Sequence, residues 1–191
     1  MTRLLLGAFP PELGPLLDAP PDGWSAACTG VGALAAAVTT ARLIAELNPE
    51  AVLFLGTCGH YDERLKVGDH LWGAEAIATS MEEARGEAYR PEIERRRWPA
   101  TLDGPLPRHA VAVPPAITAT REGAALLAKL APAEHLELTG VYAACAAAGI
   151  RVGAALAVVN EVGPAANAEW RANHAEGSRR LIAALRDFRV I

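Results

Sequence analysis

The chain has 191 residues, of which 51% are hydrophobic and 21% charged, and its formal net charge is −4. This length can bury a substantial core, and we expect residues 1–191 to form one domain. The weak negative charge argues against a nucleic-acid or anionic-membrane surface, since such surfaces are rich in basic residues. No apolar run approaches the length that spans a bilayer. The three cysteines lie far apart, with no spacing typical of a metal site. We therefore expect a cytoplasmic protein with reduced cysteines and neither metal nor cofactor.

Short apolar runs and longer Ala- and Leu-rich segments alternate along the chain, and they predict buried strands and helices respectively. Strands are expected at 3–8, 24–28, 51–55, 75–80, 109–113, 117–120 and 154–159. Helices are expected after the prolines at 10 and 11 and at 33–47, 122–130, 141–148 and 168–188. The charged stretch 81–97 indicates a solvated helix or a mobile loop. This alternation predicts an α/β layered fold with a largely parallel central sheet.

The stretch 50–72 stands out because an apolar run in it leads directly into glycines and polar side chains. The run 51–55 is too short for three helical turns and is followed by Gly56-Thr57-Cys58-Gly59, so we expect a strand that ends in a glycine turn. Glycine would let the backbone of this turn approach a ligand closely or adopt a positive φ. Glu12 likewise follows the first expected strand, at the carboxyl edge where open α/β sheets place their ligands.

Five segments carry polar residues or glycines beside these expected elements. They read GAFPPELGPLL, TGVGALAAAVTTARLI, LGTCGHYDERLKVGD, LELTGVYAACAAAGI and VVNEVGP. In this order, and over most of the chain, they resemble the purine nucleoside phosphorylase and nucleosidase superfamily, which includes methylthioadenosine nucleosidases and futalosine hydrolases. The resemblance implies a single-domain, three-layer phosphorylase-like fold, with a mostly parallel twisted sheet flanked by helices.

The resemblance assigns catalytic roles to two residues. Glu12 is expected to act on water as a general base. Asn160 is expected to address the purine N7 and the substituent at C6. An aspartate in that place suits a 6-amino purine, whereas an amide both donates and accepts and therefore suits a 6-oxo base.

Four further residues form the expected substrate-binding set. Glu137 would accept hydrogen bonds from ribose hydroxyls and ease the positive charge that develops on the sugar. Leu136 stands where the family has a ribose-packing methionine. Thr57, with Gly59 near it, would bond the sugar or the attacking oxygen. The chain departs from the family at Leu136, Leu138, Leu156 and Val159, and the purine-stacking aromatic residue has no evident counterpart.

Water is the expected nucleophile. Phosphorylases of this superfamily hold phosphate with arginines near the opening strand and before the glycine segment, where this chain has Phe9 and Phe54-Leu55. Phosphate needs such positive partners, and arginine's planar fork is the usual one. Arg42, Arg64 and Arg121 keep a phosphorylase open as an alternative.

The best substrate implied is futalosine, a nucleoside of the menaquinone pathway, from which hypoxanthine would be released. A methylthioadenosine/adenosylhomocysteine nucleosidase is an alternative, as is a non-catalytic relative that binds a nucleoside. The expected partners are a small-molecule nucleoside and further copies of the chain, in a homodimer or higher homo-oligomer, with no nucleic acid and no membrane.

Overall fold

The computed structural model describes residues 2–191. The strands are β1 (Arg3–Gly7), β2 (Trp24–Cys28), β3 (Ala51–His60), β4 (His70–Ala78), β5 (Arg97–Pro99), β6 (Arg108–Val113), β7 (Ala133–Glu134) and β8 (Arg151–Glu161). The helices are α1 (Pro10–Leu13), the 3-10 helix η1 (Gly14–Leu16), α2 (Ala33–Leu47), α3 (Met81–Arg85), α4 (Arg121–Leu127), α5 (Leu138–Ala148) and α6 (Ala166–Asp187).

All eight strands belong to one sheet, in which five of the strands close into a ring. β8 pairs in parallel with β3 and antiparallel with β4. A second path joins the same two strands, because β3 pairs with β7, β7 with β6, and β6 with β4. β1 pairs in parallel with the start of β3, on the edge opposite β8 that β7 occupies further along, and β2 pairs in parallel with β1. The expected mixed α/β fold with a mostly parallel central sheet is confirmed, and the ring closure adds a feature that strand patterns did not predict.

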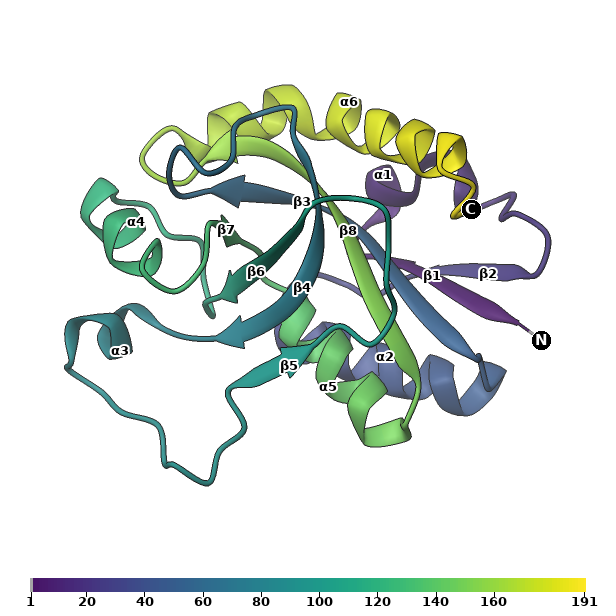
Figure 1. Ribbon diagram of the computed structural model, residues 1–191, viewed down its shortest axis with the longest axis horizontal. Coiled ribbons are helices and arrows are strands. Elements are labelled where there is room, and N and C mark those ends of the chain that lie inside the picture. The colour runs from purple at the N-terminus through teal and green to yellow at the C-terminus, as the bar shows by residue number, and fades with distance from the viewer. Residues whose placement is uncertain (1) are drawn as a thin grey trace.

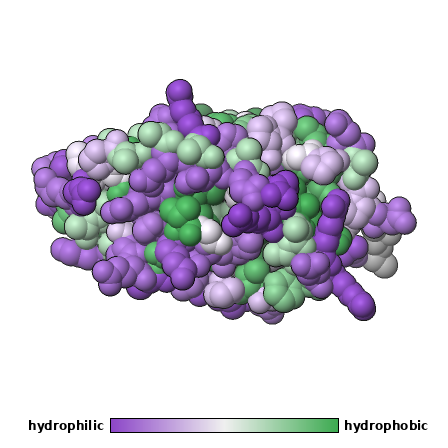
Figure 2. Space-filling view, turned by 90° about the horizontal axis from the view of Figure 1, so that it is seen from above, coloured by the Kyte–Doolittle hydropathy of each residue, from purple (hydrophilic) through white to green (hydrophobic). Residues whose placement is uncertain are grey.

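Helices cover the sheet on two faces, which gives three layers (Figure 1). α6 and α1 lie on one face, and α2 and α5 lie together on the other. β3 and nearly all of β8 are buried along their lengths, which explains their continuous apolar sequences. Seen from the side of α6, hydrophilic residues cover most of the surface, and apolar residues form only small separate groups (Figure 2).

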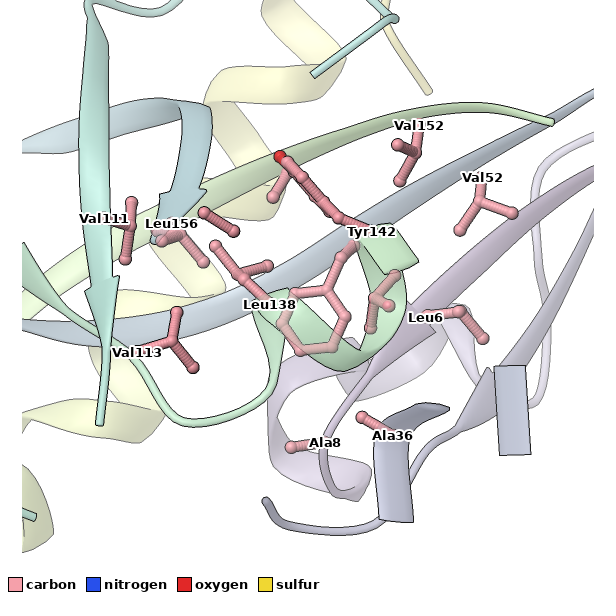
Figure 3. Packing of buried hydrophobic residues seen from close by; sticks show 14 of the residues in the cluster. Leu6, Ala8, Ala36, Val52, Val111, Val113, Leu138, Tyr142, Val152 and Leu156 are labelled. Atoms are coloured by element: carbon pink, nitrogen blue, oxygen red, sulfur yellow. The ribbon is translucent and has the colours of Figure 1, made fainter. Parts of the chain in front are cut away.

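The packing of α5 against α2 and the sheet sets the position of the later site residues. Leu138 and Tyr142 project from α5 toward the strands (Figure 3), and the Tyr142 hydroxyl donates to the Gly73 carbonyl over 2.6 Å. On the side facing α2, a Cβ at Gly140 would lie only 2.0 Å from the Ala33 carbonyl oxygen. Glycine at 140 therefore lets the two helices touch, which brings the start of α5 against the start of α2.

Two local predictions were wrong. The segment 56–59 is not a turn but the continuation of β3, and neither Gly56 nor Gly59 has a positive φ. These glycines are needed because other side chains fill the space in front of them. The segment 117–120 is not a strand either; it precedes α4, with Thr120 as its N-cap.

The charged stretch 81–97 begins with α3, none of whose residues is buried, and continues as an irregular segment to β5. It is therefore solvated, as predicted. None of the helices within residues 2–191 has the length and apolar character needed to cross a membrane.

Candidate active site

A cavity of about 480 Å³ opens where β1, β3 and β8 reach their carboxyl ends. These strands run parallel, so their last residues meet at one edge of the sheet. The residues singled out from the sequence all line this cavity: Glu12, Thr57, Gly59, Leu136, Glu137 and Asn160. The fold therefore brings together residues that lie far apart in the sequence.

Glu12 is buried, and its carboxylate is held at both oxygens. Oε2 accepts a hydrogen bond from the Ala8 N–H over 2.8 Å. Oε1 accepts from the N–H and the hydroxyl of Thr57, over 2.8 and 2.9 Å. Burial raises the pKa of Glu12 to about 7, although these hydrogen bonds oppose the rise. A carboxyl that titrates near neutrality is suited to proton transfer.

Thr57 links Glu12 to helix α6. Its hydroxyl donates to Glu12 and accepts from the indole Nε1 of Trp170 over 3.2 Å. The Thr57 proton is therefore directed at the carboxylate, and only acceptor capacity remains for another partner. The Trp170 ring also stacks on His174, with 4.4 Å between centroids, and tilts against Phe9 at 5.7 Å.

Glu137 occupies the N-cap position of α5, where it is buried rather than exposed to solvent. Its Oε1 accepts from the Gly32 N–H at the start of α2 over 2.7 Å, a contact that the close approach at Gly140 permits. Its Oε2 lies 3.1 Å from Nδ1 of His135, which also accepts from the Glu137 N–H. Burial lowers the pKa of His135. The ring is therefore neutral near pH 7, and its contact with Glu137 is not an ion pair.

Asn160 is buried at the end of β8, beside Gly59 of β3. Its Nδ2 donates to the Glu161 carbonyl over 3.0 Å, which leaves one N–H and the Oδ1 oxygen for a ligand. A Cβ at position 59 would lie 2.8 Å from this Nδ2 and 2.7 Å from Val162. Glycine at 59 thus makes room for the amide.

A third buried carboxylate in the lining was not found from the sequence. Glu134 of β7 accepts from the Tyr61 hydroxyl over 2.7 Å, and from the N–H and hydroxyl of Thr118 over 3.0 and 2.5 Å. Glu134 stands next to the family-like segment but belongs to no motif, so no local signal distinguished it. Burial raises the pKa of the Tyr61 hydroxyl, and the neighbouring charge of Glu134 raises it further.

Apolar side chains complete the cavity. Phe9, Val31, Ile117 and Trp170 are among its lining residues. Phe9 and Trp170 are also the aromatic residues of the lining, which the sequence alone did not identify. Cys58 faces the same space, but burial raises the pKa of its thiol and leaves it protonated.

No lysine or arginine lines the cavity in the part of the chain that the structure describes. Arg42 pairs with Glu46, and Arg64 pairs with Asp62 and donates to the Ala128 carbonyl. Arg121, at the start of α4, is exposed and outside the lining. The charged groups around the cavity are therefore carboxylates, which do not favour an anionic ligand such as phosphate.

A model of the phosphorylase superfamily matches residues 23–139. Among solved structures, native futalosine hydrolase of Helicobacter pylori strain 26695 superposes with a TM-score of 0.81 at 18% identity, over 97% of each chain. The 5′-methylthioadenosine/S-adenosylhomocysteine nucleosidases of Helicobacter pylori and Neisseria meningitidis give TM-scores of 0.83 and 0.79. The Helicobacter pylori nucleosidase is 16% identical, and the match covers 98% of each chain. The Neisseria meningitidis nucleosidase is 19% identical, and the match covers 95% of this chain and 96% of the nucleosidase. A search of curated proteins found no match.

Proposed function

The chain belongs to the phosphorylase superfamily, and on that premise we propose that it hydrolyses the N-glycosidic bond of a purine nucleoside. The observation that carries the proposal is the convergence of Glu12, Glu137 and Asn160 on one cavity, in whose lining residues 2–191 place no lysine or arginine. We call the surroundings of Glu12, Thr57 and Glu137 the sugar end of this cavity. The surroundings of Gly59, Asn160 and Glu134 are the base end.

Glu12 is the proposed general base. Water attacks C1′ of the sugar, the C1′–N9 bond breaks, and its electron pair leaves with the purine. Glu12 takes a proton from the attacking water and later returns it to solvent, and the departing base takes up one proton from solvent, so that overall one water is added across the C1′–N9 bond. The pKa of about 7 supports this role, because the carboxyl is then partly ionised at neutral pH and holds a proton readily.

Glu137 and Leu136 are the proposed sugar contacts. Oε1 and Oε2 of Glu137 retain acceptor sites beyond those facing Gly32 and His135, so the carboxylate can accept from ribose hydroxyls. Its negative charge also favours the oxocarbenium-like transition state. Leu136 supplies the apolar surface beneath the sugar. Thr57 fixes Glu12 and offers its remaining acceptor site to a sugar hydroxyl or to the attacking water.

The proposed nucleophile is water rather than phosphate. The purified protein should release free base from a nucleoside panel at the same rate with and without added phosphate. Phosphate-dependent release, with formation of a ribose phosphate, would make the protein a phosphorylase and contradict the proposal.

We propose a 6-oxopurine nucleoside as the substrate, with futalosine in menaquinone biosynthesis as the specific case. The free N–H of Asn160 can donate to the 6-oxo group, and Oδ1 can accept from N7–H once N7 is protonated as the base departs. Asn160→Asp should therefore shift the preference toward 6-amino nucleosides. If the wild-type protein releases adenine efficiently and does not cleave 6-oxopurine nucleosides, the proposed substrate is wrong. The proposed hydrolytic activity would still stand.

The apolar part of the cavity supports a second candidate. Phe9, Val31, Ile117 and Trp170 would suit an alkylthio substituent on the sugar, as in methylthioadenosine. The same nucleoside panel decides between the two, because methylthioadenosine releases adenine and futalosine releases hypoxanthine.

We further propose that the chain works as a homo-oligomer. Val31, Leu34 and Val38 are 64%, 81% and 64% exposed, and their spacing places Leu34 and Val38 on one face of α2. Val31 also lines the cavity. Light scattering should give a mass of at least two chains, and Leu34→Lys should lower it.

A further inference from the structure

Glu134 is a buried carboxylate of the cavity lining to which the proposed hydrolysis assigns no task. All three groups bonded to it are donors, namely the Tyr61 hydroxyl and the N–H and hydroxyl of Thr118. Donors on every side are what an ionised carboxylate requires. An ionised carboxylate has about four acceptor sites, and three are occupied. The fourth acceptor site is on Oε1, which accepts only from the Thr118 N–H.

The sheet register places Glu134 at the base end. Gly59 of β3 pairs with Glu134 of β7 on one side and with Asn160 of β8 on the other. Directly paired residues send their side chains to the same face of a sheet. Since Gly59 has no side chain, β3 places none between Glu134 and Asn160; the Asn160 amide and Val162 lie in front of Gly59 instead. All three residues line the cavity, so a planar base bound there could meet the amide at one edge and the carboxylate at the other.

The two edges require different chemistry. If Asn160 bonds N7 and the 6-substituent, the opposite edge of the purine carries N1 and C2. In a 6-oxopurine N1 bears a hydrogen, whereas in a 6-aminopurine N1 is an acceptor. An acceptor-only carboxylate pairs with the first and opposes the second.

We propose that Glu134 is a specificity-determining residue that accepts a hydrogen bond from N1–H of a 6-oxopurine. This inference rests on the proposed function, from which it takes the place of the base. Tyr61 and Thr118 hold the carboxylate in position, and Asn160 and Glu134 together select for the 6-oxo form.

A ligand comparison on the wild-type protein tests this without a substitution. Calorimetry should show that hypoxanthine binds about 10- to 100-fold more tightly than 1-methylhypoxanthine, the range expected for one unmatched buried polar group. Equal binding of the two bases, or binding of neither, would overturn the inference.

Glu134→Gln tests the carboxylate itself. The amide has nearly the same shape, but its NH₂ can donate to N1 of a 6-aminopurine. The ratio of kcat/KM for inosine over adenosine should fall about 10- to 100-fold. Tyr61→Phe is the matched control, because it removes one donor to Oε2 and leaves Oε1 and the charge. It should affect both nucleosides alike.

The alternative is that Glu134 only anchors the segment around Thr118. Glu134→Gln would then slow both nucleosides equally, and the preference would not move. Should the protein hydrolyse nucleosides without discriminating at N1, this inference fails and the proposed function stands. If it binds hypoxanthine in the N1-dependent way but cleaves no nucleoside, the proposed function fails and the role of Glu134 in base recognition stands.

Discussion

The two ends of the cavity are built in different ways. At the sugar end, Glu12 and Glu137 accept from the backbone N–H groups of Ala8, Thr57 and Gly32. These donors belong to β3 or adjoin β1 and α2, so they are fixed by the fold itself. At the base end, Glu134 depends largely on side chains, the hydroxyls of Tyr61 and Thr118. The proposed proton transfer and sugar binding therefore rest on groups held by the backbone, whereas the proposed base selection rests on side chains that single substitutions can change.

The largest effect is expected at the sugar end, from Glu12→Gln. Turnover should fall by roughly 10²- to 10⁴-fold for every nucleoside, the usual share of general acid–base catalysis. The amide NH₂ must also face either Ala8 N–H or Thr57 N–H, both of which are donors. Rates should therefore be compared at equal concentrations of folded protein.

Glu169→Gln is the matched control for Glu12→Gln. Glu169 also accepts from a backbone N–H, that of Glu161 over 2.8 Å, but does not line the cavity. Turnover in this variant should stay near that of the wild type. Near-normal turnover in Glu12→Gln would show that Glu12 is not the general base.

The raised pKa of Glu12 also predicts how stability depends on pH. The folded protein keeps this proton up to about pH 7, whereas the unfolded chain loses it near 4.5. The contribution to the free energy of unfolding is therefore complete below pH 4.5, falls as pH rises, and is lost above pH 7. The total loss is about 3 kcal/mol. Urea unfolding at several pH values should show this decline in the wild type but not in Glu12→Gln.

Glu137→Gln isolates charge at the sugar end. The amide oxygen can still accept from the Gly32 N–H, and the NH₂ faces Nδ1 of neutral His135, an acceptor that it would share with the N–H of residue 137. The geometry should therefore survive while the negative charge is lost. We expect kcat/KM to fall roughly 10- to 100-fold, as for loss of one electrostatic contact in the transition state. A similar fall for inosine and adenosine would confirm that this end does not select the base.

The sequence predicted the cavity residues that follow strands better than the others, and the reason is physical. Glu12 and Asn160 follow apolar strands, and the carboxyl ends of parallel strands must meet at one edge. Glu134 and Trp170 have no such marker. The bond from Trp170 to Thr57 joins residues 113 positions apart, and Glu134 sits in a strand of two residues.

The same reasoning explains the two local errors. Gly56 and Gly59 read as turn residues, but they are small because His135 and Asn160 occupy the space in front of β3. The segment 117–120 has strand-forming residues, yet the Thr118 N–H bonds to the Glu134 side chain instead of a neighbouring strand. In both places tertiary contacts, which no local pattern contains, decided the structure.

The smallest effect is expected at the base end, from Gly59→Ala. The added Cβ would lie 2.8 Å from Nδ2 of Asn160 and 2.7 Å from Val162, so the amide must shift by a few tenths of an ångström or more. Overpacking of this kind costs about 1–3 kcal/mol, and part of that cost should appear as a weaker fit of the base. We expect KM to rise about tenfold with kcat changed much less, because Glu12 and Glu137 keep their backbone donors. Steady-state kinetics with inosine measures both constants. A fall in kcat at unchanged KM would mean that the two ends are not separable, since a change beside Asn160 would then reach the proton transfer at Glu12.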